Sequence, residues 1–226
     1  MDKSISIIIP VRNEGAGLAP FLQALQPLRK QAEIIIVDGN STDQTYTIAT
    51  PLCDLILSSQ PGRAQQMNTG AQQASTSTLL FLHADTYFPD HALKMIKTAL
   101  QTHDWGRFNI QLSGAHFMFR IIETCINLRS RISNVATGDQ AIFVKKAAFK
   151  NADGYPDIPL MEDVALSKKL RKQSSAACIK TTATTSSRRW EKNGIFTTIL
   201  LMWQLRFAYF LGVSPSKLAR IYYPQQ

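Results

Sequence analysis

Short apolar runs alternate with helical patterns along the first hundred residues of the chain. The runs at 4–9, 33–38, 54–58 and 79–86 are rich in Ile, Leu and Val, which predicts strands buried on both faces of a sheet. Strand and helix repeated four times predict right-handed βαβ units, and therefore an α/β fold with a parallel sheet covered by helices. The expected helices are one opened by Pro20 with Leu18, Phe21, Leu22, Leu25 and Leu28 at helical spacing, one capped by Ser41, a polar one over 63–74, and one after Pro89 with Leu93, Ile96 and Leu100 on one face.

The second half of the chain is less regular. Strands are predicted at 107–112 and 179–185, and residues 138–144 are predicted as a turn that leads into a buried strand. One helix is predicted at 117–132, and another begins at Glu162 and Asp163 and continues to 172. Carboxylates in a first helical turn are favoured by the helix dipole, so these two have a structural explanation as well as a catalytic one. The apolar face of the first helix consists of Phe117, Ile121, Cys125 and Leu128.

Two of the predicted strands lead into a carboxylate, at Asp38 and at Asp85. The carboxyl ends of parallel strands share one edge of a sheet, where open α/β folds bind ligands. Side chains gathered there would hold a divalent cation through oxygen, together with a nucleotide. The alternative is that each aspartate lies in a turn or caps the helix that follows, and the residues alone leave both interpretations open.

Residues 195–213 form the longest strongly apolar segment. Its length approaches the ~20 residues of a membrane span. Gln204 and Arg206 near its middle argue against a span, since an arginine at the bilayer centre costs at least ~2.5 kcal/mol. We expect an amphipathic helix that lies on a membrane surface or packs on the domain, and the sequence favours neither.

The composition is that of a basic globular protein. At 226 residues and 45% hydrophobic content, the chain fits one large domain, alone or with an appended arm. A net charge of +9 favours anionic partners, but the chain has no RNA-recognition or zinc-finger motif, so we expect no nucleic acid. Three scattered cysteines and the lack of a signal-peptide pattern favour a cytoplasmic protein, with peripheral attachment to the inner face of the membrane left open.

Seven short motifs carry a resemblance to a known family. They are Ile7–Glu14, Val37–Asp43, Gly62–Ala64 with Asn68–Ala71, Leu82–Asp85, Gly138–Gln140, Glu162–Asp163 and Arg189–Trp190. In this order they resemble the inverting glycosyltransferases of family 2, which have the GT-A fold. The compact length and the His83-Ala84-Asp85 form are similar to a small bacterial subgroup.

The resemblance implies a GT-A-like, mostly parallel mixed sheet flanked by helices. This domain would occupy 1–190, with a nucleotide-binding half at 1–105 and an acceptor and catalytic half at 106–190. A basic, apolar helical arm at 191–226 would follow it.

The resemblance also implies roles for individual residues. Asp163 would be the general base that deprotonates an acceptor hydroxyl, and Glu162 would orient the site. Asp85, with His83 beside it, would hold Mg²⁺ or Mn²⁺ against the donor diphosphate. Asp38 would accept the N3–H of uracil. The residues expected to contact the nucleotide-sugar or the acceptor are Pro10, Val11, Glu14, Asp38, Arg63, Asn68, Ala84, Gly138, Asp139, Gln140, Arg189 and Trp190.

The chain departs from the family's pattern at two positions. The usual metal motif has carboxylates at both outer positions, and His83 takes the first of them here. Ser186 replaces the Gln of the Gln-x-x-Arg-Trp pattern of processive synthases. We therefore expect transfer of a single sugar, most simply from a UDP-sugar, to a small-molecule or lipid-linked acceptor. The sequence leaves a homodimer open.

Two other functions are compatible with parts of the sequence. A nucleotidylyltransferase would need a glycine-rich, cationic loop after the first strand, and Val11–Gly15 fits poorly because Glu14 is acidic. A catalytically inactive module that binds a membrane surface or a nucleotide would use the basic C-terminal helix.

Overall fold

The computed structural model describes residues 3–89 and 91–223 and places eight strands of this part of the chain in one sheet. The strands are β1 (Ile5–Val11), β2 (Ala32–Asp38), β3 (Leu55–Ser58), β4 (Thr78–Phe81), β5 (Thr86–Tyr87), β6 (Trp105–Leu112), β7 (Phe143–Lys145) and β8 (Ala177–Thr185). Their order across the sheet is β3-β2-β1-β4-β7-β6-β8-β5. The first two residues of the predicted domain and the last three of the predicted arm lie outside the described residues.

The sheet is mixed but mostly parallel, which confirms the predicted fold class. β1 is parallel to both β2 and β4, β2 is parallel to β3, and β6 is parallel to β8. β7 lies antiparallel between β4 and β6, and β5 is antiparallel to β8. The carboxyl ends of β1, β2 and β4 therefore meet at one edge, as predicted for the ligand-binding edge of an open α/β sheet.

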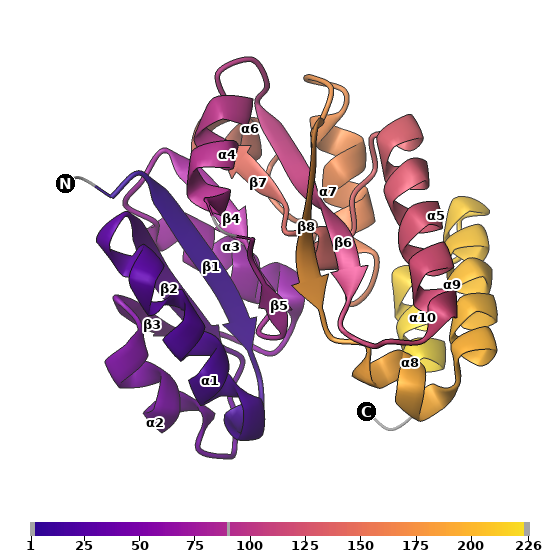
Figure 1. Ribbon diagram of the computed structural model, residues 1–226, viewed down its shortest axis with the longest axis horizontal. Helices are drawn as coiled ribbons and strands as arrows, with labels where there is room; N and C mark the ends of the chain where they lie inside the picture. The colour runs from indigo at the N-terminus through magenta and orange to yellow at the C-terminus, as the bar shows by residue number, and fades with distance from the viewer. Residues whose placement is uncertain (1–2, 90, 224–226) are drawn as a thin grey trace.

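Helices cover both faces of this sheet (Figure 1). On one face lie α1 (Gly15–Leu25), α2 (Thr45–Ala49) and α4 (Ala92–Ala99), and on the other α3 (Arg63–Gln73), α6 (Lys146–Asn151) and α7 (Glu162–Leu170). Side chains alternate along a strand, so Ile7 and Ile9 of β1 join the first core while Ile8 joins the second. Short 3₁₀ turns complete these connections at η1 (Gln26–Lys30), η2 (Thr50–Leu52) and η3 (Gly138–Gln140).

Four helices cluster at the end of the molecule beyond β6 and β8, on the right in Figure 1. They are α5 (Phe117–Ser133), α8 (Arg188–Asn193), α9 (Ile195–Phe210) and α10 (Pro215–Tyr222). Leu205 of α9 and Leu218 of α10 are buried in a cluster with Val164 of α7, so the segment predicted as an arm packs on the domain. Among the described residues, no helix is both long and apolar enough to cross a bilayer.

Three local predictions were wrong in detail. α1 begins at Gly15, so Pro20 lies inside it; the carbonyl that Pro20 leaves without an intrahelical donor is that of the exposed Ala16. Ser41 does not cap α2, because its hydroxyl donates to Asp38 and α2 begins only at Thr45. β4 ends at Phe81, so Asp85 follows in a turn rather than at the end of the strand.

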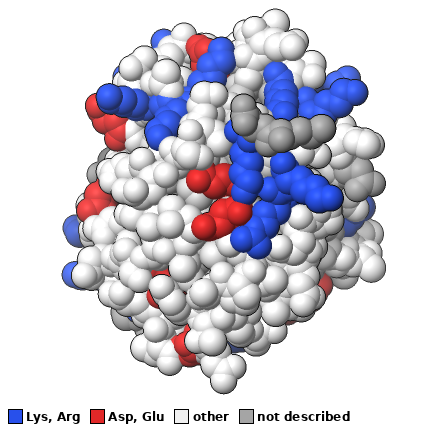
Figure 2. All heavy atoms as spheres, turned by 90° about the vertical axis from the view of Figure 1, so that its left-hand side faces the viewer, with Lys and Arg blue, Asp and Glu red and all other residues white. Residues whose placement is uncertain are grey.

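The end of the molecule opposite α5 and α9 carries charges of both signs close together. Figure 2 shows this end, where basic side chains gather around acidic ones. Asp54 at the start of β3 pairs with Lys3 and with Arg29, at 2.7 and 2.9 Å. These cations therefore neutralise a neighbouring carboxylate instead of forming a purely basic patch.

Candidate active site

A cavity of about 530 Å³ lies between the carboxyl edge of the sheet and the helices α7 to α10. This volume is within the range of small-molecule sites. Segments far apart in the chain line it, and ten of the sixteen predicted site residues are among the lining side chains. These are Glu14, Arg63, His83, Asp85, Gly138, Asp139, Glu162, Asp163, Arg189 and Trp190.

Asp163 is held at the start of α7 by two backbone donors. The Gly138 N–H donates to its Oδ2 at 2.7 Å, and the Val164 N–H donates to its Oδ1 at 2.6 Å. Burial and the neighbouring Glu162 raise the pKa of Asp163 to about 7, against the lowering effect of those two donors. A carboxylate with a pKa close to neutral pH, fixed in orientation, is suited to accept a proton.

Arg63, at the first position of α3, faces the two acids of α7 across the cavity. Burial alone would lower the pKa of its guanidinium, but Tyr223 and the carboxylates of Glu162 and Asp163 outweigh this and raise it. Arg63 therefore remains a cation inside a concave, partly acidic site. A guanidinium in this position offers paired donors to phosphate oxygens.

His83 lies in the turn after β4 and packs against the loop before β7. A Cβ built on Gly138 would be 2.5 Å from the His83 Nε2, so the imidazole sits directly against the glycine backbone. Burial and the Arg63 charge lower the pKa of His83 to about 3, and the ring is therefore neutral at neutral pH. The absence of a side chain at Gly138 is what allows the ring to fit there.

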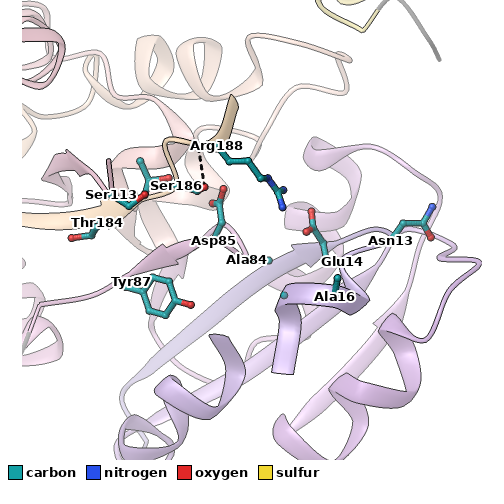
Figure 3. Close-up of a pocket in the computed structure, with 12 residues that line it drawn as sticks. Asn13, Glu14, Ala16, Ala84, Asp85, Tyr87, Ser113, Thr184, Ser186 and Arg188 are labelled. Atoms are coloured by element: carbon teal, nitrogen blue, oxygen red, sulfur yellow. Dashed lines mark hydrogen bonds between the residues drawn. The ribbon is translucent and has the colours of Figure 1, made fainter. Parts of the chain in front are cut away.

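Asp85 lies where this cavity meets a second one of about 320 Å³. Figure 3 shows Glu14, Asp85 and Arg188 around this junction, with the Arg188 guanidinium turned toward the Glu14 carboxylate. Burial, followed by repulsion from Asp85, raises the pKa of Glu14. Asp85 is exposed and its main neighbour is Thr86, whose hydroxyl lies 3.4 Å from Oδ1, so its oxygens are accessible to a ligand. Ala84 lines the second cavity only.

Gly138, Asp139 and Gln140 form the turn η3 at the floor of the cavity. Burial raises the pKa of Asp139, and its Oδ1 has no hydrogen-bond partner among the described residues. Arg129 of α5 lies near enough to Asp139 for their charges to interact. Gln140 does not line the cavity, because it is buried and its Oε1 accepts the Thr137 N–H at 3.1 Å.

The residues predicted to contact the nucleobase of the donor lie outside the two cavities. Asp38 ends β2 with only 4% of its surface exposed, and its oxygens accept the N–H and the hydroxyl of Ser41. The Val11 carbonyl accepts the Gly39 N–H at 2.9 Å and the Gln66 amide at 2.8 Å. Pro10 pairs with β2 inside the sheet. Asp38 thus lies at the carboxyl edge of the sheet but does not line the cavity that contains Asp85 and Asp163.

Asn68, predicted to contact the ligand, instead connects α3 to the loop before α7. Its amide donates to the Tyr155 carbonyl at 2.8 Å and accepts the Tyr155 N–H at 3.0 Å. This pair of hydrogen bonds fixes the loop that leads to Glu162 and Asp163.

The C-terminal helices supply a wall of the cavity that sequence reasoning missed. Arg189 lies over the Tyr222 ring, with 3.6 Å between the guanidinium carbon and the ring centroid, and donates to the Tyr222 carbonyl at 3.3 Å. Arg206 of α9 also lines the cavity, as does Arg188. The basic composition of 188–226 was the available signal, but nothing in the sequence indicated that these cations face the acids of α7.

Comparison with known proteins adds a partial family match and a fold. Residues 6–108 match the sequence family described as Glycosyl transferase family 2. The match covers a little under half of the chain. The matched segment contains Asp38, Arg63 and Asp85, whereas Glu162 and Asp163 lie beyond it.

Two curated proteins illustrate the sequence similarity of the chain. The 4,4'-diaponeurosporenoate glycosyltransferase of Staphylococcus haemolyticus is 30% identical over 42% of this chain and 28% of its own length. The undecaprenyl-phosphate 4-deoxy-4-formamido-L-arabinose transferase of Photorhabdus laumondii is 26% identical over 45% of this chain and 35% of its own length. The chain therefore spans about a third of the length of the curated relatives that it matches.

Solved structures extend the similarity to most of the chain and support a GT-A-like fold. S. aureus TarS 1–349 has a TM-score of 0.65 at 20% identity, covering 81% of this chain and 60% of its own. The mannosyltransferase PcManGT from Pyrobaculum calidifontis, solved in complex with GDP-Man and Mn²⁺, has a TM-score of 0.64 at 17% identity, covering 92% of this chain and 61% of its own.

Proposed function

We propose that the protein transfers a single sugar from a nucleotide-sugar to an acceptor hydroxyl, with inversion at the anomeric carbon. The observation that carries this proposal is the gathering of Arg63, Asp85 and Asp163, from three separate segments, around one cavity. The match of residues 6–108 to glycosyl transferase family 2 supports it.

Asp163 acts as the general base in this proposal. Its carboxylate accepts the proton of the acceptor hydroxyl as that oxygen attacks the anomeric carbon. The N–H groups of Gly138 and Val164 fix the carboxylate, and burial beside Glu162 keeps its pKa near neutral, so it binds a proton more readily than an ordinary aspartate. Glu162 and Arg63 adjust the charge around it.

The proposed position of a divalent cation is at Asp85, as a single carboxylate ligand, because the described residues contain no group of three or more His, Cys, Asp or Glu side chains arranged as a metal site. This carboxylate is exposed at the junction of the two cavities, and Mg²⁺ is commonly held by one or two carboxylates together with substrate phosphates. His83 is neutral and adjacent, although its Nε2 edge is turned against Gly138. A bound Mg²⁺ or Mn²⁺ would neutralise charge on the departing nucleoside diphosphate. The Mn²⁺ in the PcManGT complex supports this assignment.

Cationic side chains around the cavity bind the diphosphate in this proposal. Arg63, Arg188 and Arg189 line the cavity from α3 and α8, and guanidinium groups bind phosphate oxygens in pairs. UDP is the proposed nucleotide. The TarS structure in complex with UDP-GlcNAc supports a UDP-sugar.

The acceptor is proposed to be a small molecule or a lipid-linked group. The name of the Photorhabdus relative specifies an undecaprenyl-phosphate acceptor, which supports the lipid-linked form. A cytoplasmic protein that works at the inner face of the membrane would meet such acceptors.

The test is turnover of UDP-GlcNAc, UDP-glucose and GDP-mannose with Mn²⁺, measured as nucleotide release. We expect turnover with a UDP-sugar, a loss of at least ~10²-fold in Asp163→Asn, and UDP binding by that variant unchanged in calorimetry. Asp157→Asn is the matched control, because Asp157 is an exposed aspartate whose Oδ2 accepts from Gln65 at 2.9 Å and which lies outside the lining of the cavity. Full turnover in Asp163→Asn would refute the assignment of the base.

A further inference from the structure

The exposed apolar side chains of this protein are concentrated on two helices. Of the thirteen large apolar side chains that are exposed in the described part of the chain, ten lie on α5, on α9 or on the residue that follows α9. Those ten are Phe117, Ile121, Leu128 and Ile132 of α5, and Phe196, Leu200, Trp203, Phe207, Phe210 and Leu211 of α9 and its end. We call them the apolar edge.

The members of the apolar edge fall on one face of each helix. In α5 they follow the spacing i, i+4, i+11 and i+15, with the exposed Cys125 between them. In α9 they follow the spacing i, i+4, i+7, i+11 and i+14. Trp203 is 70% exposed and Phe210 78% exposed, so large aromatic rings lie in solvent. A soluble monomer rarely exposes a continuous apolar surface of this kind without a partner.

The two faces adjoin. Ile195 and Ile199 of α9 pack with Ile122 of α5 in one cluster, so the helices touch through their inner sides. Figure 1 shows α5 and α9 side by side at the same end of the molecule. Their outer sides therefore form one surface. The side chains of the apolar edge are exposed and do not contribute to the core of the domain.

The segments that hold the apolar edge and the helices next to it carry most of the net positive charge of the protein. Residues 117–133 and 188–222 hold nine Lys and Arg side chains against two carboxylates. Four of the nine line the cavity, whereas Arg120, Arg131, Lys217 and Arg220 are exposed outside it. Those carboxylates already have partners, because Glu123 pairs with Arg120 at 2.9 Å and Glu191 accepts the Ser187 hydroxyl at 2.8 Å. At the opposite end of the molecule, by contrast, Asp54 pairs with two cations.

We propose that the apolar edge docks on a bilayer that contains anionic lipid. Large apolar and aromatic side chains flanked by cations are the features by which helices lie in the interfacial region. A second copy of the chain is disfavoured as the occupant, because a two-fold contact through this face would bring like charges together. The sequence predicted this property only for 195–213, and the structure adds α5 as an equal part of the surface.

Docking through the apolar edge would place the cavity beside the lipid headgroups. Thr198, Met202 and Leu205, on the inner side of α9, line or border the cavity, while Trp203 and Phe207 face outward. A lipid-linked acceptor would then reach Asp163 by passing around one helix. This last step rests on the proposed transferase function, whereas the docking itself does not.

The test measures binding of the full chain to vesicles, without nucleotide or metal. We expect flotation with phosphatidylcholine vesicles that contain about 30 mol% phosphatidylglycerol, and at least tenfold weaker binding to pure phosphatidylcholine. Trp203→Ser with Phe207→Ser, and separately Ile121→Ser with Leu128→Ser, should each weaken binding at least tenfold, because each removes two large apolar side chains. These side chains are exposed, so both variants should keep the thermal melting curve of the parent protein.

The matched control is Tyr46→Ser, an exposed aromatic residue on α2 at 45% exposure, which should leave vesicle binding unchanged. The fluorescence of Trp203 should also shift to the blue on vesicles, and Trp203→Phe should abolish the shift while binding persists. The proposal is overturned if both double variants bind like the parent protein, if only the α9 variant is affected, or if neutral vesicles bind equally well. It is also overturned if light scattering shows a dimer that the double variants convert to monomer and the parent protein does not bind vesicles.

Discussion

The stability of the Asp163→Asn variant relative to the parent protein should increase as the pH rises, even though the substitution removes the proposed general base. Asp163 has a pKa of about 7 in the folded protein against 3.8 for an ordinary aspartate. The folded state therefore holds a proton that the unfolded state has already released between these two values. Stability of the parent protein should fall as the pH rises from about 4 to about 7 and should level off above that.

The magnitude follows from the difference between the two pKa values. A difference of roughly 3 units corresponds to about 4 kcal/mol at 1.36 kcal/mol per unit. An asparagine cannot ionise, so the variant does not lose this stability as the pH rises. Its single amide oxygen can accept only one of the two backbone N–H groups that donate to Asp163. That lost hydrogen bond is a constant offset of about 1 kcal/mol and does not change with pH.

The assay is urea unfolding of the parent protein and of Asp163→Asn at several pH values. The difference in unfolding free energy should move in favour of the variant by about 3 kcal/mol between pH 4.5 and pH 8, which corresponds to roughly 6–12 °C in melting temperature. Asp157→Asn, which changes an exposed aspartate, should show no such trend. A difference that stays constant with pH, or that shifts against the variant as pH rises, would refute the burial argument.

Three further predictions concern the same cavity. The kcat/KM of the transferase should rise about tenfold per pH unit below pH 7 and level off above it, because only the ionised Asp163 accepts a proton; a flat profile from pH 5 to 8 would contradict this. Gly138→Ala should destabilise the protein by about 1–3 kcal/mol in urea unfolding, since its Cβ would be 2.5 Å from the His83 ring. The control Gly17→Ala, in a helix where a Cβ meets nothing within 4 Å, should stabilise it by about 0.5–1 kcal/mol. Asp85→Asn should raise the Mn²⁺ concentration needed for half-maximal activity at least ~10-fold without changing UDP binding in the absence of metal, and equal metal dependence would remove Asp85 as the ligand.

The sheet could be predicted from the sequence because its strands are buried on both faces. Ile7 to Ile9 and Ile34 to Ile36 are continuous apolar runs, and each of these side chains is fully buried. Such runs, separated by helical patterns, leave few alternatives to βαβ units. The antiparallel position of β7 depended on pairing between distant segments, which no local pattern records.

Residues of the candidate site could be predicted from the sequence only where they belong to a recognisable motif. Asp85 and Asp163 were found because each belongs to a short motif of the resemblance, and the structure brings both to one cavity. Tyr222 and Arg206 belong to no motif, and their place in the cavity wall depends on how α9 and α10 fold back on α7. Asp38 was expected in the same cavity, but the hydroxyl and N–H of Ser41 already occupy its oxygens.

The helical pattern of α5 shows a limit of the same kind. Its apolar residues were correctly predicted to share one face, but periodicity does not say what covers a face. The residues that hold α5 in place are instead Phe119, Ile122 and the buried carboxylate of Glu123, which accepts the Leu112 N–H at 2.6 Å.

The late position of the cavity wall in the chain has a consequence for biosynthesis. All eight strands of the described residues are complete by Thr185, so a chain still emerging from the ribosome can form the whole sheet before α9 has emerged. Val135, Leu160 and Val164 would then be uncovered, because Leu205 and Leu218 are the residues that bury them. A product terminated near residue 190 should therefore expose these apolar side chains and be prone to aggregation, so that chaperones and proteases would recognise it.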